Sequence, residues 1–404
     1  MRVSTNLFYQ SGLNAILDQQ SGLQTTQEKI ATGVNVQKPS DDPIASISIL
    51  NLEQEIALTE RYNSNIDIAE SILSTEETTI QSFTEILQRI RSLILSGGNA
   101  TYGAPEKESL ALEAEELLNQ LVGLANFKTS AGDYLFSGYR TDIVPFTQDA
   151  AGNFQYNGDQ GVRKIQVSTS TQIASNDSGY QIFQNILNGN GDYVAAEDLA
   201  NTGTGIINTG SVVDRTAYIA DDYTISIVNL GGGTLGYSVT DRFGFPVLTN
   251  QPYSDGGDIT FNGINFNISG TPDIGDSFTL TRSNRQDVFT TVKNAVEALR
   301  LPVFNDADSA HQDNALARAV VDLDQAMEHI GTVQSEVGTR LNILQNQTLI
   351  NTDFIISSKI TLSNIRDLDM AEAITNLNLQ QISLEAAQSS FVRIQNLSLF
   401  NFLR

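Results

Sequence analysis

Few residues in this chain have the types and spacing that catalysis or metal binding requires. His311 and His329 are the only histidines, and the 404 residues include no cysteine. A metal site or an acid–base pair needs further ligands or partners at suitable spacing, and neither histidine has them. We therefore expect both to be packed or solvated side chains. No catalytic residue, no metal site and no cofactor is predicted, and disulfides and thiolate chemistry are excluded.

Two other segments contain residues that are often functional. Asp41 and Asp42 could form a carboxylate pair, but Pro43 follows directly. Asp before Pro is a typical helix start, because Asp caps free N–H groups and Pro fits the first turn. We interpret Asp42 and Pro43 as a helix cap. The glycine run 231–233 lacks the Lys-Ser/Thr ending and the following helix of a phosphate-binding loop, so a loop between strands is predicted there.

The charge and the start of the chain restrict the partners. Asp and Glu total 47 against 23 Lys and Arg, a formal net charge of -24. Such a surface repels phosphate backbones and anionic lipid, so neither nucleic acid nor membrane insertion is expected. The first residues contain no apolar core of signal-peptide length, and no run reaches the roughly 18 apolar residues of a membrane span. Export would therefore need a route without an ordinary cleaved signal.

Long helical patterns occupy both halves of the chain. The first runs from Pro43 to the glycines 97–98, and a second helix follows Pro105. A short helix is predicted over Asp287–Arg300, and a long seam runs from Leu316 to Ile365. Apolar residues three and four apart over such lengths are typical of coiled-coil-like packing. One polar residue breaks the first seam, which consists of Ile66, Ala69, Leu73, Glu76, Ile80, Phe83, Leu87, Ile90 and Ile94.

The centre of the chain has a different composition. Residues 141–286 are rich in Gly, Asn, Asp and Thr, and alternating segments occur at Tyr223–Val228 and Ser277–Leu280. Alternation with period two predicts strands, and Asn-Gly or Asp-Gly pairs are typical of hairpins. The hairpin candidates are Asn157-Gly158, Asp255-Gly256 and Asn262-Gly263. A β-rich insertion is therefore expected, with a short turn over Gln181–Leu187.

The two ends of the chain form a separate group. Their charges balance, and apolar residues recur every seven positions. The C-terminal segment is apolar on several faces, which one partner helix cannot cover. We expect both ends to be largely disordered in the monomer and to fold on assembly. The predicted assembly interface consists of Tyr9, Leu13, Ile16, Leu23, Ile30, Met370, Ile374, Leu377, Leu384, Phe391, Ile394, Leu397 and Phe400.

These patterns predict a mainly α fold with a β-rich insertion, built on an elongated coiled-coil-like bundle from both chain halves. Residues 1–42 and 366–404 would form a terminal helical assembly domain. Residues 43–140 and 287–365 would form the helical bundle, and 141–286 an outer insertion domain.

Four motifs in order resemble the flagellin superfamily, particularly its hook-associated members. Lys38–Ala45 contains a Pro-Ser-Asp-Asp-Pro element, and Gly132–Gly138 with Pro145-Phe146 is similar to the segment that leaves the bundle in this family. Asp367–Ile374 resembles the start of the C-terminal helix. The closing Leu397–Leu403, preceded by Ala386-Ala387-Gln388, is likewise similar. Together these matches cover the two flanks but not the central insert.

The resemblance implies a structural role in the bacterial flagellum. Such a subunit is secreted unfolded by the type III export apparatus, with an export chaperone holding its C-terminal helix. It would form a ring with copies of itself on hook-associated protein 1, at the junction between hook and filament, and flagellin would add beyond it. Two alternatives remain: flagellin itself, and an exported adhesin or enzyme whose site would lie in residues 141–286.

Overall fold

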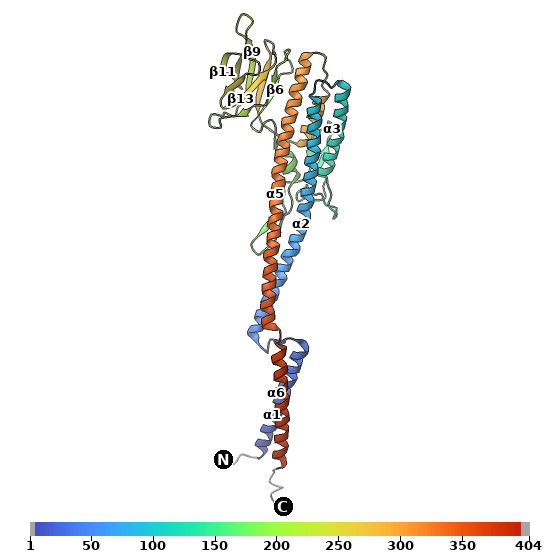
Figure 1. Cartoon of the computed structure of the whole chain (residues 1–404), viewed down its shortest axis with the longest axis vertical. Helices are drawn as coiled ribbons and strands as arrows, with labels where there is room; N and C mark the ends of the chain where they lie inside the picture. Colours follow the sequence, from blue (N-terminus) through green and yellow to red (C-terminus); the bar gives the residue numbers. More distant parts are fainter. Residues whose placement is uncertain (1–4, 397–404) are drawn as a thin grey trace, which may run out of the picture. The chain divides into compact units, whose positions relative to one another are not determined.

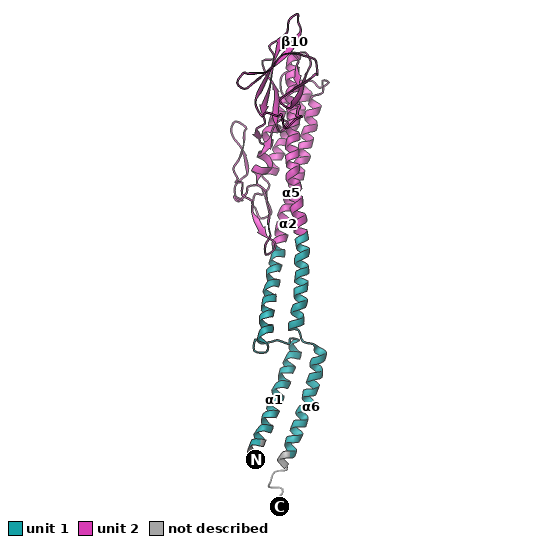
Figure 2. Ribbon diagram, turned by 90° about the vertical axis from the view of Figure 1, so that its left-hand side faces the viewer, with its two compact units in different colours: residues 1–64, 346–404 teal, residues 65–345 magenta. Residues whose placement is uncertain are grey.

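The computed structural model describes residues 5–396 and divides the chain into two compact units, each described by itself. One unit comprises Met1–Ser64 with Asn346–Arg404, and the other comprises Asn65–Gln345 (Figure 2). Helices dominate both ends of the sequence and strands its centre (Figure 1), which confirms the predicted fold class. The helices are α1 (Thr5–Thr32), α2 (Pro43–Gly97), α3 (Ala104–Ala125), α4 (Val288–Leu299), α5 (Asp306–Arg366) and α6 (Met370–Asn396).

The core of the second unit follows the predicted seams. Every residue of the α2 seam is fully buried, including Glu76. In α3 the buried face consists of Ala111, Ala114, Leu118, Leu121 and Ala125. α5 begins at Asp306, ten residues before Leu316, the first residue of its predicted seam. The long helices thus bury their apolar faces against one another, as the period of the sequence requires.

Strands make up most of the insert. Their bounds are β1 (Phe146–Gln148), β2 (Phe154–Tyr156), β3 (Lys164–Gln166), β4 (Gln172–Ala174), β5 (Ile186–Leu187), β6 (Tyr193–Glu197), β7 (Ile206–Ile207), β8 (Ser211–Val212), β9 (Tyr223–Asn229), β10 (Leu235–Asp241), β11 (Pro246–Pro252), β12 (Asp258–Phe261), β13 (Ile264–Ser269), β14 (Ser277–Arg282) and β15 (Arg285–Gln286). A π-helical turn, η1 (Tyr180–Gln184), precedes β5 where a short turn was predicted.

The insert divides into two parts with different cores. Residues 141–187 pack on the helices: Phe146 and Phe183 lie in the same buried cluster as α2 and α4. The ring centroids of Phe83 and Phe183 are 4.6 Å apart, and those of Phe146 and Phe289 are 5.0 Å apart. This part of the predicted insertion therefore belongs to the bundle, because its aromatic side chains complete the bundle's core.

Residues 193–282, here called the outer β domain, have a core of their own. The antiparallel order β11-β10-β9-β14-β6 forms one sheet, and β12-β13-β7 with β8 forms the other. Side chains alternate between buried and partly exposed along β9 and β13, as the predicted strand pattern requires. Their buried members, such as Ile225 and Phe266, form a cluster separate from that of the bundle.

Only one of the three predicted hairpin dipeptides closes a hairpin in the described residues. Asn262 and Gly263 both have positive φ and join β12 to β13, where Phe261 pairs with Ile264. Asp255-Gly256 instead forms a turn between strands of different sheets, and Asn157-Gly158 lies in the connection from β2 to β3. Those two predictions were wrong, because a turn dipeptide makes a hairpin only when the flanking strands pair.

The first unit contains the terminal helices. α1 and α6 run antiparallel, since Tyr9 contacts Phe391 while Gln19 donates to the Gln380 carbonyl at 3.4 Å. Backbone hydrogen bonds join the segment that follows α1 to the junction between α5 and α6. One of them runs from Asn35 N–H to Arg366 O, at 2.8 Å. Within residues 5–396, no helix combines the length and apolar character needed to cross a membrane.

Candidate assembly surface

The α1–α6 pair buries very little of its own apolar surface. In the described parts of α1 and α6, Ala373 is the only buried apolar residue. Tyr9 and Phe391 stack with centroids 4.9 Å apart, and a Cβ at Gly12 would approach the Phe391 ring to 3.0 Å. The two helices are therefore in close contact along one face, but two helices alone cannot cover the others.

The predicted interface residues fall into two sets within this pair. Tyr9, Leu13, Met370 and Ile374 are between 43% and 47% exposed. The half-buried set, in the predicted seven-residue rows, is Ile16, Leu23, Ile30, Leu377, Leu384 and Phe391. The side chain of Ile394, and Leu397 and Phe400 entirely, lie outside the described residues. Other exposed apolar residues of these helices, which the seven-residue rows did not include, are Leu7, Leu17, Leu379, Ile382 and Val392.

The parts of α2 and α5 in the same unit add exposed apolar residues that the sequence reasoning missed. On α2, Ile44, Ile47 and Leu50 are 80%, 61% and 63% exposed. On α5, Leu349 and Ile360 are 65% and 58% exposed. The sequence contains a pattern that could have revealed the α2 residues, because these three apolar side chains are spaced by three and so lie near one another on the helix.

Asp42 and Pro43, the predicted helix cap, have helix-cap geometry in the structure. The Asp42 Oδ1 atom accepts hydrogen bonds from the N–H groups of Ile44 and Ala45, both at 3.0 Å. The Asp41 carboxylate accepts from Lys38 N–H at 3.0 Å. Both carboxylates therefore bind the backbone where the terminal segment gives way to α2, and α2 begins at Pro43.

The other residues considered as catalytic or metal-binding candidates, the two histidines and the glycine run, have structural roles. His311 contacts the Asn201 carbonyl and His329 the Gln181 carbonyl, through Nε2 in each case. Glycines 231–233 form a loop between β9 and β10, as predicted. Among the residues that the structure describes, no group of acidic or histidine side chains is arranged to hold a metal ion.

Glu76, the polar residue in the α2 seam, lies inside a charged cluster. Its Oε1 accepts from the Asp177 N–H at 3.1 Å, and Asp177 forms a forked ion pair with Arg340 of α5 at 2.7 and 3.0 Å. Burial, followed by the nearby Asp177 carboxylate, raises the pKa of Glu76 well above its ordinary range, although Arg340 and Arg163 oppose this. Glu76 therefore has a structural role, because it links the segment around Asp177 to α2.

A helical fold with exposed apolar rows at both chain ends is typical of subunits that complete their core in an assembly. The descriptions "Bacterial flagellin N-terminal helical region" and "Bacterial flagellin C-terminal helical region" match residues 3–141 and 315–403. These matches define the class, which is that of flagellin-like proteins.

Individual relatives narrow this class. Flagellar hook-associated protein 3 of Salmonella typhimurium is 24% identical over 100% of both chains. A crystal structure of hook-associated protein 3 from Legionella pneumophila shares 32% identity, with a TM-score of 0.76 over 78% of this chain and 98% of that one. A second structure, of the flagellar junction protein from the same organism, is 32% identical with a TM-score of 0.74, over 79% of this chain and 100% of that one. The chain belongs to the hook-associated protein 3 family.

Proposed function

We propose that this chain is a structural subunit of the bacterial flagellum that joins the hook to the filament. The observation that carries this is its similarity, along the whole chain, to hook-associated protein 3, together with its structural likeness to a flagellar junction protein. The role is mechanical and needs no catalysis. The protein would act outside the cell, after export through the flagellar type III apparatus with a chaperone.

The interface would be the apolar surface of α1 and α6. In the ring, neighbouring subunits would cover the exposed rows that contain Tyr9, Leu13, Met370 and Ile374. Burial of such side chains yields about 25 cal/mol per Å² of apolar surface, which offsets the ordering of the helices. Hook-associated protein 1 would lie on one side of the ring and flagellin on the other. Protease mapping of the monomer tests the prediction that both ends are disordered before assembly.

Gene deletion tests the function and separates it from the alternatives. Bare hooks with flagellin shed into the medium would support the junction role. Bare hooks with no flagellin anywhere would identify the chain as the filament subunit, an alternative raised by the flagellin family matches. Normal filaments would contradict the proposal and direct attention to an adhesin or enzyme function of the outer β domain.

A matched pair of variants in the deletion strain tests the surface itself. Ile374→Asp places a charge on a side chain that is 47% exposed and that assembly would bury. We expect a soluble, helical monomer that fails to restore filaments. Asn376→Asp adds the same charge at an exposed polar position of the same helix and should restore them. Filaments with both variants would show that this row is not an interface.

A further inference from the structure

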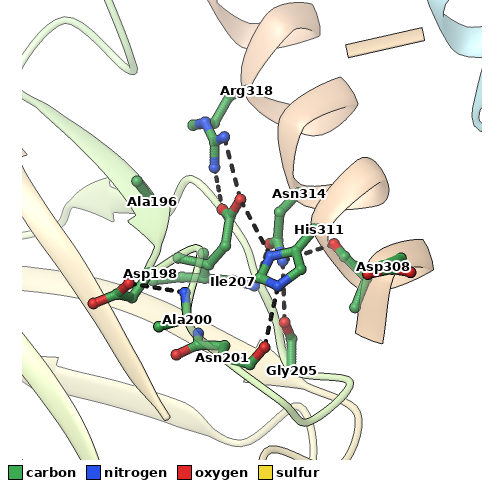
Figure 3. Close-up of polar contacts among 12 residues, drawn as sticks. Ala196, Asp198, Ala200, Asn201, Gly205, Ile207, Asp308, His311, Asn314 and Arg318 are labelled. Carbon is green, nitrogen blue, oxygen red and sulfur yellow. Dashed lines mark hydrogen bonds and ion pairs between the residues drawn. The ribbon is translucent and has the colours of Figure 1, made fainter. Parts of the chain in front are cut away.

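The outer β domain contacts α5 through a row of polar side chains. His311, Asn314, Arg318 and Asp322 are spaced by three, four and four residues, which places them on one face of the helix. We call this row the docking stripe. Figure 3 shows His311 and Asn314 directed toward the segment that follows β6, and Arg318 directed toward the end of that strand. The opposite apolar seam of α5, through Leu323, faces the bundle.

A forked ion pair lies at the centre of this contact. Arg318 Nη1 pairs with Glu197 Oε2 at the end of β6, and Nη2 lies 3.3 Å from Glu197 Oε1. The Glu197 side chain is only 2% exposed. Two parallel bonds between guanidinium and carboxylate fix both distance and angle, so this pair specifies an orientation.

Asn314 and His311 extend the contact along the loop. Asn314 is buried, and its Oδ1 accepts from the Ile207 N–H at 2.9 Å while its Nδ2 donates to the Gly205 carbonyl at 3.0 Å. His311 Nε2 lies 3.2 Å from the Asn201 carbonyl and must donate there, because a carbonyl only accepts. Its Nδ1 lies 3.9 Å from the Glu197 carboxylate.

The two bodies joined by these bonds have separate apolar cores. The buried cluster of the outer β domain extends in sequence from Tyr193 to Leu280. The buried cluster of the bundle contains no residue from that stretch of the sequence. The chain enters the domain through residues 188–192, where Gly189 and Gly191 have φ values of +62° and +88°. It leaves through residues 283–284. Asp322 Oδ1 accepts from the Gly189 N–H at 2.6 Å and so holds the entering linker.

We propose that the docking stripe is a latch that fixes the orientation of the outer β domain, and that without it the domain pivots on residues 188–192 and 283–284. Relative motion is the default for two bodies with separate cores unless a large apolar interface joins them. Here the contact consists mainly of directional bonds, which set geometry more than they add stability. This inference does not depend on the proposed flagellar function.

Distance measurement between spin labels tests the latch. The chain has no cysteine, so Thr249→Cys on β11 and Glu116→Cys on α3 give two labelling sites at exposed positions. Double electron–electron resonance on the labelled full chain should give one narrow distance distribution. Adding Arg318→Leu should broaden that distribution or add a second population. Asn314→Leu should do the same, and it carries the test if Arg318→Leu fails to fold.

An exposed ion pair provides the matched control. Arg89 and Glu113 join α2 and α3 at 2.6 Å, with side chains 55% and 43% exposed. Arg89→Leu removes the same kind of pair and should leave the distribution narrow. The latch is contradicted if both stripe variants are folded by circular dichroism yet keep the parent distribution, or if the control broadens it equally.

Hydrogen exchange gives a second readout. The Ile207 N–H is bonded to Asn314 and not to Arg318. Loss of the ion pair should nonetheless accelerate exchange at Ile207 by about tenfold, because the latch opens as a unit. Unchanged exchange at Ile207 in folded Arg318→Leu protein would mean that the bonds of the stripe act independently, and the latch would be rejected.

Discussion

Glu76 and Glu197 are both buried in the same unit, yet their surroundings differ. Glu197 lies directly against the guanidinium of Arg318. Among the described residues Glu76 has no ion pair: its Oε1 accepts from the backbone N–H of Asp177, and the nearby Arg340 is paired with the Asp177 carboxylate. Burial therefore has different consequences for the two carboxyl groups. The Arg318 guanidinium lies directly against Glu197, whereas burial and the nearby Asp177 carboxylate raise the pKa of Glu76.

The two sites also have different tasks. Glu76 lies in the apolar seam of α2 and connects the segment around Asp177 to the bundle, so its contact belongs to one shared core. Glu197 connects two bodies with separate cores. The comparison indicates that the bundle holds a buried acid without an ion pair inside a continuous core, whereas docking of the outer β domain uses an oriented ion pair.

Removal of Arg340 should have the largest effect. Arg340→Leu leaves the Asp177 carboxylate, whose side chain is 10% exposed, without its forked partner and beside Glu76. Removing one partner of a buried pair costs about 3–5 kcal/mol. Urea unfolding followed by circular dichroism should show that loss. A loss under about 1 kcal/mol would mean that water enters the cluster and that the pair is effectively exposed.

Neutralising Glu76 should stabilise the protein in a pH-dependent way. Below its ordinary pKa, near 4.5, Glu76 is protonated in both folded and unfolded chains and has no effect. As the pH rises above that value, the unfolded chain ionises while the folded one keeps its proton. Stability is therefore lost with rising pH. Glu76→Gln removes this loss, so the variant should become increasingly more stable than the parent as the pH rises above about 4.5.

Unfolding of both proteins at several pH values measures this difference. The gap between Glu76→Gln and the parent should be small near pH 4 and grow toward neutrality. A constant gap would show that the substitution acts through packing or hydrogen bonding and not through the proton. Glu77→Gln, on the neighbouring position of α2, is the control for the loss of one negative charge.

Much of this arrangement could be predicted from the sequence, but only where local pattern determines structure. The limits of α2 followed from Asp42-Pro43 and the glycines 97–98, and Glu76 was visible as the break in its seam. The role of Glu76 was not visible, because Asp177 and Arg340 come from distant segments. Packing of residues 141–187 on the bundle was missed for the same reason, since a short strand has the same local pattern in either core.

The docking stripe was missed for a different physical reason. His311, Asn314 and Arg318 have helical spacing, but polar residues at that spacing are the usual pattern of a solvated helix face. A solvated and a docked polar row differ only in whether another segment approaches. That approach depends on the path of residues 193–207, which the sequence pattern of α5 does not encode.

Replacing the whole Glu197–Arg318 pair should affect stability far less than breaking it. Glu197→Leu with Arg318→Leu leaves no unpaired charge, and apolar replacement of a buried pair is often neutral. We expect a change within about 1 kcal/mol in urea unfolding. The orientation of the outer β domain should nevertheless become less defined in the spin-label experiment. A double variant as unstable as Arg318→Leu alone would show that the pair contributes stability directly.

The smallest effect is expected at the surface pair between Arg89 and Glu113. Its short distance of 2.6 Å resembles that of the buried pairs, but water solvates both groups in either state. Exposed pairs typically contribute about 0.2–1 kcal/mol and weaken with added salt. Arg89→Leu should therefore shift urea unfolding by at most about 0.5 kcal/mol, and by less in 1 M salt. A larger loss would mean that distance between charges, and not burial, decides what an ion pair contributes here.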